Sequence, residues 1–306
     1  MRTTSLLLTL AYAATLVMGR PTTTTSTTDA AEATGTSSSS SSSGQVQVFE
    51  HCNRPGVFAL TFDDGPDKYS WGLAKTLKEQ GVKATFFLNG DNSVNVLSDS
   101  TMTDEGEKTY LEVIKHYYDS GHEVASHTLK HMNLVGLTEE QVKEQMNKQS
   151  DIIYKAIGKR VRLMRPPEGV IDDVSSKVLS ELGYYDIMWD VDTKDWEHKG
   201  LKAEQARIRE VMDKDVANKT MGHIALEHDI HEDTVKTLVP WFVDYVKQKG
   251  YEFVTVSDCI GVEPYFEDAN STITANASAT TVDYNELAHG SVASVDSIPI
   301  TTPASN

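Results

Sequence analysis

The sequence predicts an α/β fold, built either as a parallel α/β barrel or as a doubly wound parallel sheet. Short apolar runs alternate with helical patterns about seven times between residues 56 and 256, which is typical of parallel strands joined by helices. Glycine follows most of the helical patterns, as the C-terminal ends of helices favour. Apolar residues make up 39% of the chain and are numerous enough to form a core.

The apolar runs predict the strands in chain order. They are Gly56–Phe62, Val82–Leu88, His122–His127, Arg162–Pro166, Tyr184–Val191, His223–His228 and Tyr251–Val256. Helices are expected between them, at Ser70–Gln80, Gly106–Asp119, Thr138–Ile157, Asp172–Leu182, Leu201–Val216 and Asp233–Lys249. Thr138 and Gln141 have the spacing of a capping box, which supports a helix start at that point.

The two ends of the chain differ in composition from this alternating region. Residues 1–19 contain an apolar run from Leu6 to Met18, which is too short to span a bilayer and is typical of a signal peptide, an uncleaved anchor being the alternative. Residues 20–48 and 263–306 are rich in Ser, Thr and Ala, and they predict flexible low-complexity segments. Residues 49–262 remain as one folded domain.

Charge and export signals limit the partners and the location. The formal net charge of −17 argues against nucleic acid, because phosphate binding needs a basic surface. The C-terminal residues TTPASN contain no hydrophobic tail, so neither a GPI anchor nor a transmembrane segment is expected. Asn218, Asn270 and Asn276 begin N-glycosylation sequons. We therefore expect a secreted monomer in the extracellular space or the cell wall.

The chain contains two cysteines, Cys52 and Cys259. In an exported protein they are expected to pair, two buried free thiols being the alternative. Cys52 precedes the first expected strand and Cys259 follows the last, and these strands would be neighbours in a closed barrel. A disulfide at this position would close the seam of the barrel.

Two adjacent carboxylates end the first expected strand. Asp63 and Asp64 follow Phe62, and Gly65 and Pro66 then force a turn. Because side chains alternate along a strand, the carboxylates point in different directions, and one can bind a cation while the other acts as a base. A pair of turn-capping residues is the alternative.

Two histidines, four residues apart, follow the third expected strand. His127 and His131 share one face if this segment turns helically, which is a common spacing of metal ligands. With a carboxylate from another strand they would form a set that leaves an open position for water, as catalytic zinc sites require. Two surface histidines are the alternative.

Further polar residues follow other strands, at the edge where parallel α/β folds place their active sites. Arg165 could orient a catalytic carboxylate or make a structural salt bridge. Asp192 and Trp196 follow the fifth strand, where a polar loop with a core tryptophan is the alternative. His228 shares a strand face with Leu226 and could act as a general acid beside a small apolar pocket, although a structural histidine is the alternative.

In this order the residues resemble the polysaccharide deacetylases with a NodB-homology domain, a carbohydrate esterase family. TFDDGP, SHTLKH, RPP, DTKDW and LEHD match that family's five motifs. The resemblance implies a distorted (β/α) barrel of about seven parallel strands with surrounding helices. CNRPGVFALTFDDGPD, DTKDW, HDIHEDTV and VTVSDCIG look closest to fungal chitin deacetylases, which implies chitin, a polymer of N-acetylglucosamine, as the substrate.

The resemblance also implies a role for each residue and one divalent metal, zinc or cobalt. Asp63 matches the catalytic base, and Arg165 matches the residue that orients this base. Asp64, His127 and His131 match the metal ligands, while His228 matches the catalytic acid and Asp192 matches its partner. Trp196 matches an aromatic wall of the sugar groove, and Leu226 matches the lining of the acetyl-methyl pocket. Glu168 departs from the family, which usually has Tyr or Phe there. The backbone N–H of this residue is expected to stabilise the oxyanion, and its side chain is expected at the wall of the groove.

These observations predict a metal-dependent hydrolase that removes N-acetyl groups from chitin and releases acetate. A deacetylase of another acetylated glycan, such as O-acetyl xylan or another aminosugar polymer, is one alternative. A non-catalytic chitin-binding wall protein is the other.

Overall fold

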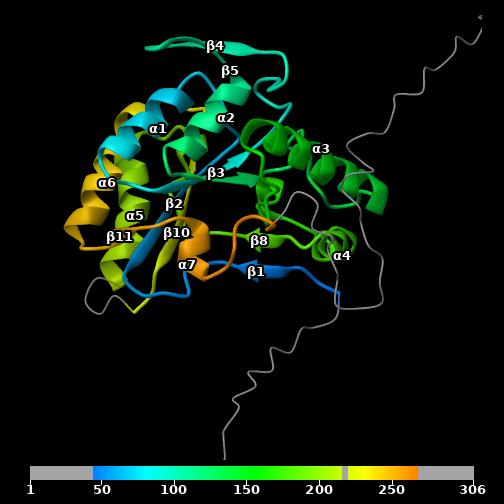
Figure 1. Cartoon of the computed structure of the whole chain (residues 1–306). Helices are drawn as coiled ribbons and strands as arrows, with labels where there is room; N and C mark the ends of the chain where they lie inside the picture. Colours follow the sequence, from blue (N-terminus) through cyan, green and yellow to red (C-terminus); the bar gives the residue numbers. More distant parts are fainter. Residues whose placement is uncertain (1–43, 216–219, 268–306) are drawn as a thin grey trace, which may run out of the picture. The chain divides into compact units, whose positions relative to one another are not determined.

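The computed structural model describes residues 44–215 and 220–267, and a sheet of nine strands forms the centre of this part (Figure 1). The strands are β1 (Gln47–Phe49), β2 (Val57–Asp63), β3 (Ala84–Leu88), β6 (Glu123–Ser126), β7 (Leu163–Met164), β8 (Tyr185–Ile187), β9 (Val191–Asp192), β10 (His223–His228) and β11 (Glu252–Phe253). Their order is β1–β8–β7–β6–β3–β2–β10–β9, and β11 also pairs with β2. All of these pairs are parallel, which confirms the predicted α/β class.

The sheet curls because β8 and β9, which follow one another in the chain, lie near opposite edges of the sheet. β8 pairs with β7 and β1, whereas β9 pairs with β10 at the other end. Only residues 188–190 separate β8 from β9, and three residues span at most about 11 Å. The result is a distorted barrel rather than a doubly wound sheet, and the single strand expected at Tyr184–Val191 is broken into two.

Helices surround the curled sheet (Figure 1). They are α1 (Ser70–Glu79), α2 (Tyr110–Asp119), α3 (Glu139–Ile157), α4 (Asp173–Glu181), α5 (Leu201–Asp215), α6 (Val239–Gln248) and α7 (Val256–Ile260), with the short turns η1 (Pro167–Gly169), η2 (Asp195–Glu197) and η3 (Thr234–Leu238). The predicted capping box starts α3, because Thr138 and Gln141 each satisfy the other's backbone N–H. Gly158 ends α3 in a left-handed conformation, with φ of 67°.

Alternation along β2 separates two hydrophobic clusters and turns Asp63 inward. Phe58, Leu60 and Phe62 pack in the larger cluster, together with residues of the surrounding helices. Val57 and Ala59 belong to the smaller cluster, with residues of β3, β6, β7, β8 and β10. Since side chains alternate, Thr61 and Asp63 continue the face of Val57 and Ala59. Asp63 therefore enters the mouth of the barrel.

Several boundaries differ from the sequence prediction, three of them as follows. A β-hairpin of β4 (Ser100–Thr103) and β5 (Gly106–Thr109) replaces the start of the helix expected at Gly106–Asp119, and α2 begins only after Thr109 caps it. β1 lies partly inside the expected linker 20–48, because it gains hydrogen bonds from β8. Tyr265 lies in the expected tail 263–306, yet it bridges to Val161. The other residues of the two ends, 1–43 and 268–306, lie outside the described part.

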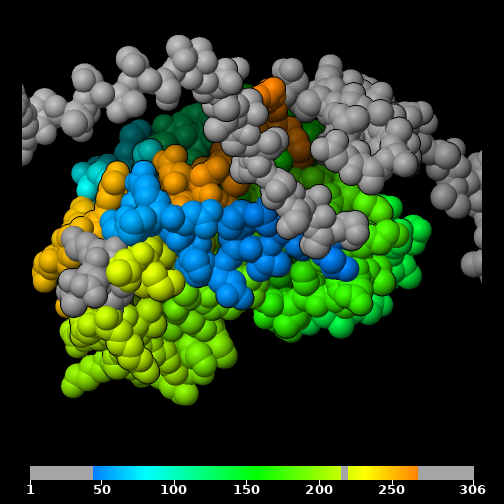
Figure 2. All heavy atoms as spheres, turned by 90° about the horizontal axis from the view of Figure 1, so that it is seen from below, coloured from blue at the N-terminus to red at the C-terminus, as the bar shows by residue number. Residues whose placement is uncertain are grey.

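The predicted disulfide joins Cys52 to Cys259, which lies in α7. The neighbouring strands are paired as well, since β11 lies parallel to β2. Seen from below, the first described residues, in blue, lie against the C-terminal segment in orange (Figure 2). Across residues 44–215 and 220–267, no helix is long and apolar enough to cross a membrane.

Candidate active site

Asp63, the last residue of β2, is held by a fully buried arginine. Arg165 Nη1 donates to Asp63 Oδ1 at 2.7 Å and to the hydroxyl of Thr61 at 2.7 Å. Asp63 is only 3% exposed. Removing two opposite charges from water is costly, so such a pair persists where further hydrogen bonds satisfy it. The contact fixes the direction of the Asp63 carboxylate.

The broken strand supplies the further hydrogen bonds to Arg165. Its Nε donates to the carbonyl of Ile187 at 2.8 Å, and its Nη2 donates to the carbonyl of Met188 at 3.2 Å. Both carbonyls lie at the break between β8 and β9, where ladder pairing stops. The Phe87 ring lies 4.2 Å from the guanidinium carbon. The distortion of the barrel thus creates the binding place for the arginine that orients Asp63.

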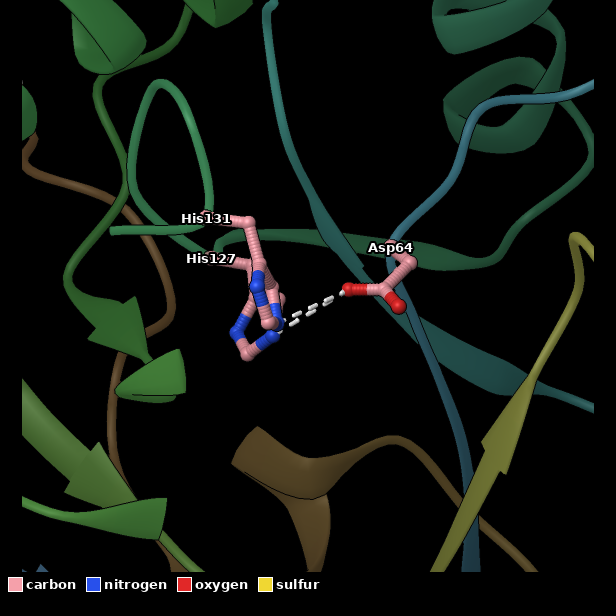
Figure 3. Close-up of side chains that lie close together, drawn as sticks. All are labelled: Asp64, His127 and His131. Carbon is pink, nitrogen blue, oxygen red and sulfur yellow. Dashed lines mark ion pairs between the residues drawn. The ribbon is translucent and has the colours of Figure 1, made fainter. Parts of the chain in front are cut away.

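Asp64, His127 and His131 converge on one point (Figure 3). Nε2 of His127 also lies 3.8 Å from Oδ2 of Asp63. Asp64 Oδ1 lies 3.5 Å from Nε2 of His127 and 3.3 Å from Nε2 of His131. Nδ1 of His127 contacts the carbonyl oxygen of Arg165 at 2.7 Å. Since a carbonyl only accepts, Nδ1 carries the proton and Nε2 presents its lone pair to the site.

The group fits a divalent metal. Asp64 Oδ1 is buried and has no hydrogen-bond partner among the described residues, an arrangement that is costly unless a cation satisfies it. Burial lowers the pKa of His127 more than Asp63 and Asp64 raise it, which favours the neutral imidazole that binds metals. Two imidazoles and one carboxylate are the donor set of many open zinc sites.

Two of these ligands, which lie in different loops, depart from ordinary backbone geometry. Asp64 has φ of 72° and His131 has φ of 52°. Left-handed conformations cost energy in residues other than glycine and are frequent at functional sites. They turn both side chains toward one point, which neither a regular strand nor a regular helix would do.

His228, at the end of β10, forms a pair with Asp195. Nδ1 of His228 lies 2.8 Å from Asp195 Oδ1, and the His228 backbone N–H donates to Oδ2 at 2.8 Å. Thr234 also donates its hydroxyl to Oδ2. Burial alone would lower the pKa of His228, but the hydrogen bond and charge of Asp195 outweigh it and raise the pKa to about 9. The imidazole is therefore protonated at neutral pH.

The partner of His228 is a correction to the sequence prediction, which assigned this contact to Asp192. Asp192 instead accepts the backbone N–H of Lys194 at 2.8 Å, through its Oδ1. Lys194 is left-handed, with φ of 55°, and the loop then turns so that Asp195 reaches the histidine. Both aspartates lie in the DTKDW segment, but nothing in the sequence of that segment indicates which of them contacts His228.

Comparison with known proteins agrees with this arrangement. A family profile described as polysaccharide deacetylase matches residues 50–187. The solved chitin deacetylase of Colletotrichum lindemuthianum is 31% identical, with a TM-score of 0.65, and the match covers 72% of this chain and 95% of that one. The chain belongs to the polysaccharide deacetylase family.

Curated members of the polysaccharide deacetylase family are similar at the same level although their names differ. A chitin deacetylase of Arthroderma benhamiae is 34% identical over 218 residues, which are 70% of this chain and 54% of the relative. A peptidoglycan-N-acetylglucosamine deacetylase of Listeria monocytogenes is 34% identical over 219 residues, which are 70% of this chain and 42% of the relative. The chain thus matches about half the length of these relatives.

The three residues expected at the sugar groove lie in different surroundings. Trp196, in η2, is 48% exposed. Leu226, in β10, is buried. Glu168, in η1, is exposed and left-handed with φ of 60°, and its carboxylate accepts a hydrogen bond from Asn133 Nδ2 at 2.9 Å. This contact ties η1 to the loop that follows His131.

Besides Asp195, a further residue that supports the site was not predicted. Asp229 is fully buried and accepts hydrogen bonds from the hydroxyls of Ser70, at 2.6 Å, and Tyr117, at 2.7 Å. Its carboxylate also occupies the space that a Cβ on Gly65 would need. Asp229 thereby holds the turn after Asp64 against α1 and α2. Its position next to His228 in LEHD was the available signal.

The sequons at Asn218, Asn270 and Asn276 lie outside the described residues. Their glycosylation stays a prediction.

Proposed function

We propose that this chain hydrolyses the N-acetyl groups of chitin and releases acetate and glucosamine units. One observation supports it above others, namely that Asp63 with Arg165, the Asp64–His127–His131 group, and His228 with Asp195 lie together at the carboxyl ends of the strands. Amide hydrolysis needs a base for water, stabilisation of an oxyanion, and an acid for the leaving nitrogen. The site offers a residue for each of these tasks.

The proposed chemistry uses Asp63 as the base and His228 as the acid, which end the adjacent strands β2 and β10. A divalent metal bound by Asp64, His127 and His131, proposed to be zinc, would supply Lewis acidity for the carbonyl and the attacking water. Asp63, held by Arg165, removes a proton from water as the water oxygen bonds to the carbonyl carbon. The C–N bond then breaks to leave acetate on one side and the amine on the other, and His228 protonates the nitrogen, because an amide nitrogen does not leave as an anion. Asp195 keeps the histidine charged until that step.

Three residues are proposed to hold the substrate. The exposed ring of Trp196 can stack on a sugar face. Leu226 lies two residues before His228 on the same strand face and can contact the acetyl methyl group. The backbone N–H of Glu168 is proposed to stabilise the oxyanion, and its carboxylate to contact the neighbouring sugar.

The choice of chitin rests on the similarity to proteins named chitin deacetylases. The relative named as a peptidoglycan-N-acetylglucosamine deacetylase makes peptidoglycan the substrate to compare with chitin. Acetate release should be measured, with zinc added, on chitin oligomers, peptidoglycan fragments and acetylxylan. We expect the highest kcat/KM on chitin oligomers. A higher value on either of the other glycans would contradict chitin while keeping the deacetylase chemistry.

The same assay tests catalysis itself against a binding role. Asp63→Asn and His228→Ala should retain the fold and lose several powers of ten in kcat, as the loss of a general base or acid predicts. Binding of chitin without acetate release by the zinc-loaded wild type would instead support a non-catalytic wall protein. Export of the chain is proposed from residues 1–19 and is consistent with the disulfide.

A further inference from the structure

A hollow of about 530 Å³ lies along α1, outside the cluster of catalytic residues. Gly72 and Thr76 line it from α1, and Gln80 lines it from the C-cap of that helix. The three recur at every fourth position and are exposed. Met102 lines it from the β4–β5 hairpin, and Val239 lines it from α6. Figure 1 shows α1 between these two elements.

Gly72 leaves room on the floor of this hollow. A Cβ built on Gly72 meets no atom within 4 Å, and its φ lies in the ordinary range. Neither the backbone conformation nor a close neighbour therefore requires glycine at this position. Within a helix, glycine is less favourable than alanine. Gly72 thus makes the helix less stable than alanine would, but its missing side chain leaves the hollow open.

One end of the hollow reaches the two catalytic loops. Lys68 and Tyr69 line it and belong to the segment that connects Asp64 to α1, while Lys236 lines it from η3, which follows His228. The Tyr69 hydroxyl donates to Glu232 at 3.1 Å and so joins the two loops. The hollow thus begins where the loop of the base meets the loop of the acid.

The lining combines apolar surface with polar edges. Leucine, valine, proline and methionine side chains contribute apolar area, and Thr76, Gln80, Thr103 and Asp104 contribute hydrogen-bonding groups. Sugar rings have apolar faces and hydroxyl edges, and such mixed, concave sites suit them. We propose that this hollow is a distal subsite for the acetylated glycan, occupied by sugars remote from the one that reacts. The inference rests on the proposed deacetylase function.

Filling the hollow tests this subsite. Gly72→Leu should lower kcat/KM on long chitin oligomers by about tenfold, through a higher KM, and leave a disaccharide substrate unaffected. Gly72→Ala should give a smaller loss, because it adds only a methyl group. Lys78→Leu introduces the same side chain on α1 outside the hollow and should alter neither substrate.

A second variant tests the opposite wall without altering α1. Met102 is 72% exposed on the hairpin, and Met102→Ala should also raise KM for long oligomers only. Leu97→Ala is the control, because Leu97 is 52% exposed but does not line the hollow. Equal changes for short and long substrates, or none for either, would overturn the subsite. Absence of acetate release by the wild type on every chain length would instead contradict the proposed function.

Discussion

At the scale of single residues, Arg165 couples the base to the proposed metal group. Its guanidinium binds Asp63, and its own carbonyl accepts the proton on His127 Nδ1. One residue therefore sets the direction of a carboxylate and the tautomer of an imidazole. The direction of the carboxylate depends in turn on the break between β8 and β9, which frees the carbonyls that anchor the guanidinium.

The first prediction at this scale concerns the charge on His228. Because Asp195 raises its pKa to about 9, activity that needs the protonated acid persists at neutral pH and is lost as pH rises through that value. In Asp195→Asn, burial acts without the opposing charge, so the basic limb of kcat/KM should move down by about one to two pH units. Asp192→Asn, the matched control, should leave that limb in place. An unshifted limb in Asp195→Asn would refute the pairing as the cause.

The second concerns the metal. His127→Ala should remove bound zinc in elemental analysis, since it deletes one of three converging ligands. Chelation should abolish wild-type activity, and added zinc or cobalt should restore it. His231→Ala is the control and should retain zinc, because its ring packs against His198 and His228 instead. Full zinc occupancy and activity in His127→Ala would contradict the assignment of His127 as a metal ligand.

At the scale of elements, the sequence predicted best where a local pattern and burial agree. β2, β3 and β10 are long and almost entirely buried, and they lie where the apolar runs predicted them. The capping box and the glycine at the end of α3 also carry their own local signals. These features need no knowledge of the rest of the fold.

The features that were missed carry no local apolar pattern that would indicate them. β1 is three residues long and forms because β8 lies beside it. The β4–β5 hairpin is polar and lacks the apolar alternation that indicates a strand. The choice of Asp195 over Asp192 follows from a left-handed turn that composition does not reveal. Five motifs therefore located the site, but they did not determine its contacts.

The short turn η1 carries Glu168, and we predict that this residue affects substrate choice. An exposed carboxylate beside the proposed sugar groove could attract the ammonium of an already deacetylated neighbour, so we propose a relative preference for partly deacetylated oligomers. Glu168→Gln should erase that preference, and high salt should weaken it in the wild type, since exposed charges are screened. Glu168→Tyr should favour fully acetylated oligomers through stacking.

The control for η1 is Asn133→Ala. It removes the hydrogen bond to Glu168 but keeps the charge, so the preference should remain. The measurement is the ratio of kcat/KM on partly and fully acetylated oligomers. An unchanged ratio in both Glu168 variants would leave this side chain without a role in substrate choice.

At the scale of the whole molecule, β2 and β11, which lie near the two ends of the described domain, are connected in two ways. β11 pairs with β2, and the disulfide links the segments that flank them. Because Cys52 and Cys259 are 207 positions apart, the cross-link encloses almost the whole described domain. Its effect on stability should therefore come mainly from the unfolded chain.

The double variant Cys52→Ala/Cys259→Ala tests this cross-link. Loss of a loop this long should lower the free energy of unfolding by about 5 kcal/mol in the chain-entropy model. Denaturant unfolding of wild type and variant without reductant measures the difference, and reductant should bring the wild type close to the variant. Alanine is chosen because both positions are almost fully buried, where serine would add an unsatisfied hydroxyl. Two free thiols in non-reducing mass spectrometry of the wild type, or a difference below about 1 kcal/mol, would contradict a stabilising bridge.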